Sequence, residues 1–236
     1  MPTILIGIDD TDNLTSPGTG RIARDLCAII TDKGHHSLGV TRHQFLVDDA
    51  IPYTSHNSGA CIAIETRDQI NSFDFVFDHI AEISAEGSDP GVCTAMIEDV
   101  PEDVFRFALD AQQKVLRIEQ AFDTAKGKNI KLCGLGGNCQ GVIGALASVG
   151  LRARGTNGRF IDLPGLRQLP NRITCDNIKQ IGIEIEHRIE KRHPSPEDIY
   201  ETFGWIRPTL IDGLPVLTVE WSDKENAWIN LDRQKK

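Results

Sequence analysis

The sequence predicts a mixed α/β fold, an α+β arrangement in which a sheet with flanking helices is followed by a small β-rich C-terminal part. Residues 3–8 (TILIGI) form a continuous apolar run rich in branched side chains, which is typical of a strand buried on both faces. Segments with helical spacing then alternate with short branched runs as far as residue 150. Short branched runs dominate the last third. We therefore expect one domain over 1–163 and a smaller β-rich domain or appendage over 164–236.

The first half of the chain starts with a strand, an acidic loop and a helix. Ile22, Leu26, Ile29 and Ile30 share one face of that helix, and Gly34 follows it as a C-cap. Further strands are expected at 35–47, 59–66, 92–97 and around 129–133. Further helices are expected over 68–85, 101–116 with a continuation or restart through 117–125, and 141–149. In the last third we expect strands at 181–188, 206–211, 214–220 and 227–231, and a short helix opened by Ser195-Pro196.

The bulk composition narrows the class of protein. The 236 residues are 40% hydrophobic and 25% charged, as in ordinary globular proteins. The sequence has neither an apolar run long enough to span a membrane nor the pattern of a secretion signal, so we expect a cytoplasmic protein. Its six cysteines form no CxxC pair, which favours scattered reduced thiols. The net charge of −9 lowers the expectation of a large nucleic-acid surface, because such surfaces are usually basic.

An acidic cluster, Asp9-Asp10-Thr11-Asp12, follows the first strand. Three carboxylates this close repel one another unless a cation or solvent offsets their charge. Hard oxygen ligands select Mg²⁺ or Ca²⁺, and Mg²⁺ commonly shares its coordination shell with substrate phosphates. In open α/β sheets ligands bind beyond the carboxyl ends of strands, and a helix N-terminus nearby favours anions. Asp9, Asp10 and Asp12 are therefore candidate metal ligands and catalytic acids. The alternative is an acidic turn without a ligand.

The loop that leads into the first helix contains glycine, threonine and arginine. Its backbone N–H groups are suited to cradling a phosphate, and Thr19 offers a hydroxyl, although no Walker motif is present. The candidate nucleotide-binding residues here are Thr11, Gly18, Gly20 and Arg21. An ordinary loop with a helix cap is an equally good reading of the same residues.

Two later loops resemble the kind of segment that carries binding residues. The first precedes a buried strand, and its candidate residues are Tyr53, His56, Asn57 and Gly59. The second is glycine-rich and leads into the small-residue helix, with Gly136, Gly137 and Gly141 as candidates. The second loop either turns its amides to an anion or allows close packing of the helix on the sheet.

Taken in order, these segments resemble the archaeal tRNA-isoleucine agmatidine synthetase (2-agmatinylcytidine synthetase) family over about residues 3–150. The matching motifs are GIDDTD (7–12), the Gly/Thr turn, IPYxxxxxGA (51–60), Pro90-Gly91 and GxIGALA (141–147). In that family a kinase-like domain uses ATP and Mg²⁺ to phosphorylate the C2 oxygen of the tRNA wobble cytidine, and agmatine then displaces the phosphate. The resemblance implies ATP and Mg²⁺ as cofactors and a kinase-like nucleotide-binding domain over 1–163. It also implies metal and phosphate binding by Asp9, Asp10 and Asp12, and phosphorylation of Thr19.

The chain also departs from that family. Gly136-Gly137-Asn138-Cys139 replace the basic residues that usually precede the last motif, and neither an OB-type domain nor zinc-ribbon spacing is recognisable. We therefore expect an ATP/Mg²⁺-dependent phosphotransferase or ligase-like enzyme with an unknown acceptor. One alternative is a tRNA-modifying subunit that needs a separate RNA-binding partner. Another is a nucleotide-binding regulatory protein without turnover.

Overall fold

The computed structural model describes residues 1–52, 54, 56–187 and 193–231. It confirms the mixed α/β class, with six α-helices and twelve strands in the described ranges. The helices are α1 (Thr19–Asp32), α2 (Phe75–Ile83), α3 (Glu102–Asp110), α4 (Ile118–Ala125), α5 (Gly141–Arg154) and α6 (Cys175–Gln180). The strands of the N-terminal part are β1 (Thr3–Asp9), β2 (His36–Gln44), β3 (Ser58–Glu65), β4 (Gly91–Met96), β5 (Ile130–Gly134) and β6 (Arg159–Asp162).

The remaining strands are β7 (Arg172–Thr174), β8 (Glu184–His187), β9 (Ile199–Glu201), β10 (Thr209–Ile211), β11 (Leu214–Ser222) and β12 (Ala227–Asn230). The strands join in the order β5-β4-β1-β3-β2-β6-β10-β11-β12-β9-β7, and β8 pairs with β11. All neighbours in this order are antiparallel except β12 and β9, and the β8–β11 pair is also parallel. The acidic cluster therefore lies at the end of an interior strand whose two neighbours, β3 and β4, are both antiparallel to it.

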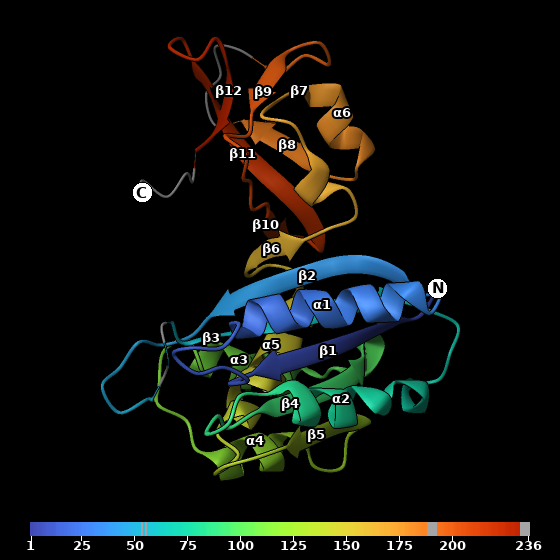
Figure 1. Ribbon diagram of the computed structural model, residues 1–236, viewed down its shortest axis with the longest axis vertical. Coiled ribbons are helices and arrows are strands. Elements are labelled where there is room, and N and C mark those ends of the chain that lie inside the picture. Colours follow the sequence, from blue (N-terminus) through green and yellow to red (C-terminus); the bar gives the residue numbers. More distant parts are fainter. Residues whose placement is uncertain (53, 55, 188–192, 232–236) are drawn as a thin grey trace.

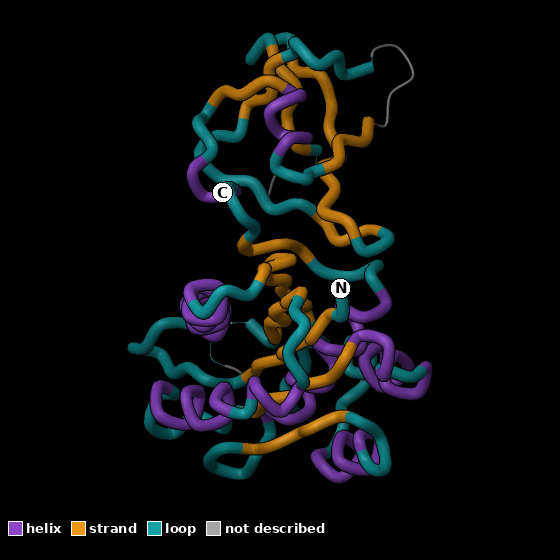
Figure 2. The backbone as a smooth tube through the Cα atoms, turned by 90° about the vertical axis from the view of Figure 1, so that its right-hand side faces the viewer, coloured by secondary structure: helices purple, strands orange, loops and turns teal. Residues whose placement is uncertain are grey.

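The N-terminal part has three layers, as Figures 1 and 2 show from two sides. Ile4, Ile6 and Ile8 of β1 face α1 and α2, whereas Leu5 faces the layer formed by α3, α4 and α5. Because successive side chains of a strand point to opposite faces, β1 is buried on both. This burial confirms the expectation drawn from the first apolar run.

Helix α5 lies close to the sheet because the strand residues that it contacts are glycines, which have no side chain. A Cβ atom on Gly7 of β1 would lie 2.1 Å from the carbonyl oxygen of Ala145. A Cβ atom on Gly91 of β4 would lie 2.1 Å from the carbonyl carbon of Gly141. Both distances are far below van der Waals contact, so only glycine allows this approach. The approach brings the N-terminus of α5 beside the end of β1.

The elements after β6 lie apart from the N-terminal layers in both views (Figures 1 and 2). They have their own apolar cluster, which includes Ile173, Ile178, Tyr200, Val219 and Trp228. The sheet nevertheless continues into them, because β6 pairs with β2 on one side and with β10 on the other. The division near residue 163 remains a prediction. None of the described helices has the length and apolar character needed to cross a membrane.

Two expectations about local structure were wrong, and one helix was not expected. The helix expected over 101–116 ends at Asp110, and residues 111–117 form a turn and a loop. The helix expected at Ser195 is a turn, in which the Ser195 N–H donates to Asp198 Oδ2 at 3.0 Å. Helix α6 was not expected, because six residues are too few to show a periodic pattern. Its start is fixed locally by the Thr174 hydroxyl, which accepts from the Asn177 N–H at 3.2 Å.

Candidate functional site

A cavity of about 390 Å³ opens at the end of β1, and we call it the acidic cavity. Asp9, Asp10 and Asp12 line one side of it. The start of α5 contributes Gln140 and Gly141, and the loop between α3 and α4 contributes Lys114 and Arg117. The apolar lining residues are Phe45, Ala50, Ile51, Pro52, Ala111, Val115, Leu116, Ile118 and Ile143. One cavity thus combines carboxylates, two cationic side chains and an apolar surface.

The carboxylates of Asp9 and Asp10 are poorly solvated and close to other negative charges. Loss of solvent around the carboxyl, followed by the charge of Asp10, raises the pKa of Asp9 to about 8. Loss of solvent, followed by the charges of Asp89 and Asp12, raises the pKa of Asp10 to about 6. Asp10 also has a left-handed backbone (φ 54°), which Asp and Asn tolerate better than most residues. The surroundings of both carboxyls therefore disfavour their charged forms.

Room for the Asp9 carboxylate comes from the absence of a side chain on Gly144. A Cβ atom there would lie 1.8 Å from Asp9 Oδ2 and 2.9 Å from the ring of Phe45. Glycine in a helix interior costs about 1 kcal/mol relative to alanine. Gly144 therefore lowers the stability of α5 but leaves the space that the Asp9 carboxylate occupies.

The third carboxylate, Asp12, is bonded to the start of α1. The Thr19 hydroxyl donates to Asp12 Oδ1 at 2.8 Å, and the Thr19 N–H donates to the same oxygen at 3.3 Å. The Thr11 hydroxyl and N–H donate to Thr19 Oγ1 at 3.0 and 3.3 Å. A hydroxyl whose proton points to a carboxylate is polarised as a nucleophile. Thr19 is only 6% exposed, yet it lines the acidic cavity.

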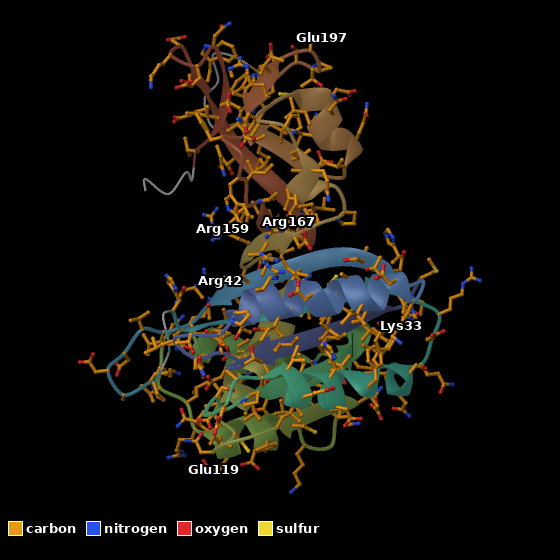
Figure 3. All side chains as sticks on the ribbon, viewed as in Figure 1. Lys33, Arg42, Glu119, Arg159, Arg167 and Glu197 are labelled. Atoms are coloured by element: carbon orange, nitrogen blue, oxygen red, sulfur yellow. The ribbon has the colours of Figure 1, made fainter. Side chains whose placement is uncertain are left out.

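A second cavity, of about 240 Å³, meets the first, and we call it the arginine groove. The two cavities share Asp12, Thr19, His56 and Ser58. The other residues that line the groove are Gly18, Gly20, Arg21, Arg24, Arg42, Gly59, Ala60, Ile161, Trp205 and Arg207. Figure 3 labels Arg42 with Arg159 and Arg167, at the level where the C-terminal elements join the N-terminal layers. Thr19 therefore lies in the wall between an acidic and a basic cavity.

Most residues singled out from the sequence lie on these two cavities. Asp9, Asp10, Asp12, Thr19, His56, Asn57 and Gly141 line the acidic cavity. Gly18, Gly20, Arg21 and Gly59 line the arginine groove, and Thr11 is buried behind Thr19. Gly136 and Gly137 line neither cavity, and Tyr53 lies outside the described residues. The functions assigned to all of these residues remain predictions.

Sequence reasoning missed several residues of the site. Lys114 and Arg117 were overlooked because the expected helix ran through them, whereas they lie in the loop after α3. Asp89 was overlooked because it stands alone in the sequence, although its charge acts on Asp10. The signal that could have found Asp89 is its place directly before the Pro90-Gly91 motif. Arg207 and Trp205 come from the C-terminal part, and no local pattern connects them with residue 19.

The carboxylates of the acidic cavity are the candidate ligands for a divalent cation. Among the described residues, no three His, Cys, Asp or Glu side chains form a group that would hold a metal ion by themselves. Asp9 and Asp10 supply carboxylate oxygens to one wall of the cavity, while Asp12 is bonded to Thr19. Mg²⁺ typically binds one or two carboxylates together with substrate phosphates and water. The residues present therefore fit a Mg²⁺ ion that arrives with a nucleotide better than a permanent metal centre.

Comparison with protein-family models and with curated proteins finds no match to this chain. Among solved structures, the chain is similar to TiaS in complex with an isoleucine tRNA and ATP, with 28% identity, a TM-score of 0.54 and coverage of 64% of this chain and 36% of the other. Apo TiaS, a tRNA agmatidine synthetase, is 26% identical, with a TM-score of 0.54 and coverage of 63% and 35%.

A tRNA fluorescent labeling enzyme is also similar, with 25% identity, a TM-score of 0.55 and coverage of 75% of this chain and 46% of the other. The chain thus spans less than half the length of these neighbours. Over roughly two thirds of its length it has the fold of tRNA-modifying enzymes, one of which is seen with tRNA and ATP.

Proposed function

We propose that this chain is an ATP- and Mg²⁺-dependent enzyme that transfers a phosphoryl group, with its nucleotide in the acidic cavity. The observation that carries the proposal is the position of Thr19. Its hydroxyl donates to Asp12 at 2.8 Å and lies where the acidic cavity meets the arginine groove. Phosphoryl transfer needs a positioned oxygen nucleophile, a proton acceptor and charge stabilisation around the phosphates, and the residues of this cavity supply all three.

The acidic cavity has the size and lining expected for a nucleotide. Its volume of about 390 Å³ falls within the range of small-molecule sites. The apolar lining residues, which include Phe45 and Ile143, suit the base of a nucleotide. Lys114, Arg117 and the start of α5 suit its phosphates. The fold neighbour seen with ATP supports a nucleotide as the ligand.

Asp9 and Asp10 would hold Mg²⁺ between their carboxylates and the nucleotide phosphates. Bound there, the ion would neutralise charge on the transferred group. It would also offset the repulsion that raises the pKa of both carboxyls.

The proposed reaction transfers the γ-phosphoryl group of ATP to Thr19. Thr19 Oγ1 forms a bond to the γ-phosphorus, and the bond from that phosphorus to the β–γ bridging oxygen breaks. ADP leaves with the electron pair of the broken bond. The hydroxyl proton passes to Asp12, whose Oδ1 already accepts it in a hydrogen bond. The phosphothreonine then passes its phosphoryl group to an acceptor.

The test is the binding of Mg²⁺-ATP to an Asp10→Asn variant. Asn tolerates the left-handed backbone at this position, so the variant removes the charge without new strain. We expect calorimetry to show loss of Mg²⁺-ATP binding. Asp123→Asn, on the exposed side of α4, is the matched control and keeps wild-type affinity. Wild-type affinity in Asp10→Asn would overturn the assignment.

A tRNA acceptor is the second candidate, because the fold neighbours act on tRNA. In the simplest form of this idea a separate subunit supplies the RNA contacts. Gel shift with bulk tRNA at moderate salt tests whether this chain binds tRNA by itself. If it does not, a tRNA acceptor requires a separate RNA-binding subunit. A nucleotide-binding regulatory protein is distinguished by tight ATP binding with no product over hours.

A further inference from the structure

A third cavity, of about 260 Å³, lies beside the arginine groove, and we call it the tryptophan cavity. Two segments form it: residues 161–169, from β6 to just beyond the short helix that follows, and residues 202–206, directly after β9. Ile161 and Trp205 also line the arginine groove, so the two cavities share a wall. The proposed phosphoryl transfer uses none of the residues that line the tryptophan cavity alone.

Most of the side chains that line the tryptophan cavity are apolar. Leu166 and Ile206 are buried at its wall, whereas the Trp205 side chain is 48% exposed. Of the described residues that line the cavity, Arg167 alone is charged. Small-molecule sites typically combine an apolar lining with a few polar groups that fix the orientation of the ligand. The cavity holds the volume of about nine water molecules, which is enough for a single ring with a short side chain.

Arg167 is held in position at the cavity by three contacts (Figure 3). Its Nη2 donates to the carbonyl oxygen of Ile161 at 2.9 Å, and its Nε lies 3.5 Å from Asp162 Oδ1. Its guanidinium carbon lies 4.7 Å from the ring centre of Trp205. Such contacts restrict an otherwise flexible side chain. A ligand that binds this guanidinium therefore has less conformational entropy to overcome.

The charges around Arg167 favour a ligand with a single negative charge. Loss of solvent, followed by the charge of Arg167, lowers the pKa of Arg24, and loss of solvent followed by Arg159 and Arg167 lowers that of Arg207. An anion at Arg167 would offset this repulsion among the cations. Asp162 already lies beside Arg167, however, so a second negative charge on the ligand would be repelled.

We propose that the tryptophan cavity binds a small monocarboxylate that carries an apolar ring or branched chain. The carboxylate accepts hydrogen bonds from Arg167, and the apolar body lies against Trp205 and Leu169. Covering these side chains removes apolar surface of both partners from water, which favours binding. Neither ATP nor Thr19 takes part, so this site does not rest on the proposed phosphoryl transfer.

The experiment is calorimetry with 3-phenylpropionate, a phenyl ring joined to a carboxylate by two methylene groups. The uncharged match is 3-phenylpropanamide, which has nearly the same shape. At about pH 7.5 the carboxylate should bind saturably with a Kd of about 1 mM or tighter, as expected for a ligand of this size. The amide should bind at least about tenfold more weakly, because it loses a hydrogen bond between charged groups. Phenyl phosphate, with nearly two negative charges at this pH, should also bind more weakly than the carboxylate.

Variants assign the binding to this cavity. Arg167→Gln should weaken 3-phenylpropionate binding at least about tenfold, and Arg167→Lys, which keeps the charge, should recover part of the affinity. Leu169→Ala should weaken the binding of both probes, because it removes an apolar contact that they share. The matched control is Arg42→Gln, which changes an arginine of the arginine groove that does not line the tryptophan cavity. It should keep the wild-type affinity, and circular dichroism melting confirms that each variant is folded.

Three results overturn the proposal: no saturable binding of 3-phenylpropionate by the wild type, equal affinity for the amide, or loss of binding in Arg42→Gln. Phenyl phosphate binding as tightly as the carboxylate overturns the assignment to a monocarboxylate. Mg²⁺-ATP binding is measured on the same proteins. Arg167→Gln should retain ATP affinity, and Asp10→Asn should retain affinity for 3-phenylpropionate. If only the carboxylate binds, the proposed function fails and this site stands; if only ATP binds, this site alone fails.

Discussion

Replacing Gly144 by alanine tests whether the position of Asp9 is set by this one glycine. In an isolated helix the change would stabilise by about 1 kcal/mol. Here the new Cβ would lie 1.8 Å from Asp9 Oδ2, 2.5 Å from Asp9 Cγ and 2.9 Å from Phe45 Cε2. Overpacking of this kind costs about 1–3 kcal/mol. We expect Gly144→Ala to destabilise by up to about 2 kcal/mol, since the propensity gain offsets part of the overlap.

The decisive measurement is a double-mutant cycle with Asp9→Ala. That second change removes both carboxyl atoms from the overlap and leaves only the edge of the Phe45 ring. In this background Gly144→Ala should cost little or should stabilise, because the helix propensity now dominates. The coupling free energy should therefore be about 1–3 kcal/mol.

Urea unfolding followed by circular dichroism gives all four free energies of unfolding, and calorimetry gives Mg²⁺-ATP affinity. Gly144→Ala alone should lose ATP binding, because the carboxylate must leave its position. Asp123→Ala on α4 replaces Asp9→Ala in the control cycle, where distant sites should add within about 0.5 kcal/mol. A coupling below that value in the Asp9 cycle would refute the reasoning.

Two further predictions follow from buried polar groups. His43 is fully buried, and loss of solvent followed by the charge of Arg152 lowers its pKa to about 3. Between that value and about 6.5 the unfolded chain binds more protons, so stability should fall as pH falls from 6.5 towards 3, by up to about 1.4 kcal/mol per pH unit. Urea unfolding should show a shallower fall in His43→Gln, and identical pH profiles would contradict the assignment. Thr19→Val should abolish phosphoryl transfer to the protein from γ-labelled ATP, whereas Thr19→Ser and the loop control Thr15→Val should retain it. Label on Thr19→Val would exclude Thr19 as the nucleophile.

Local patterns were sufficient for several features of the fold. The apolar run before Asp9 predicted a strand buried on both faces, because burial selects apolar residues wherever the neighbours come from. The branched runs at 184–187 and 214–222 lie within or overlap the expected strands. The glycines before and within α5 were interpreted either as an anion-binding loop or as a means of close packing of the helix on the sheet. A Cβ atom on Gly141 would lie 2.5 Å from the Gly91 nitrogen, so close packing does require glycine at this position.

The sequence by itself thus determined the mixed α/β class and the acidic end of the first strand, since both depend on residues that are neighbours in the chain. Only the tertiary structure decided that Lys114 and Arg117 enter the acidic cavity, because the helix before them stops at Asp110. Only the tertiary structure brought Arg24 and Arg207 together beside Thr19. The net charge pointed away from such a basic surface, because a sum over the chain carries no information about where the charges lie.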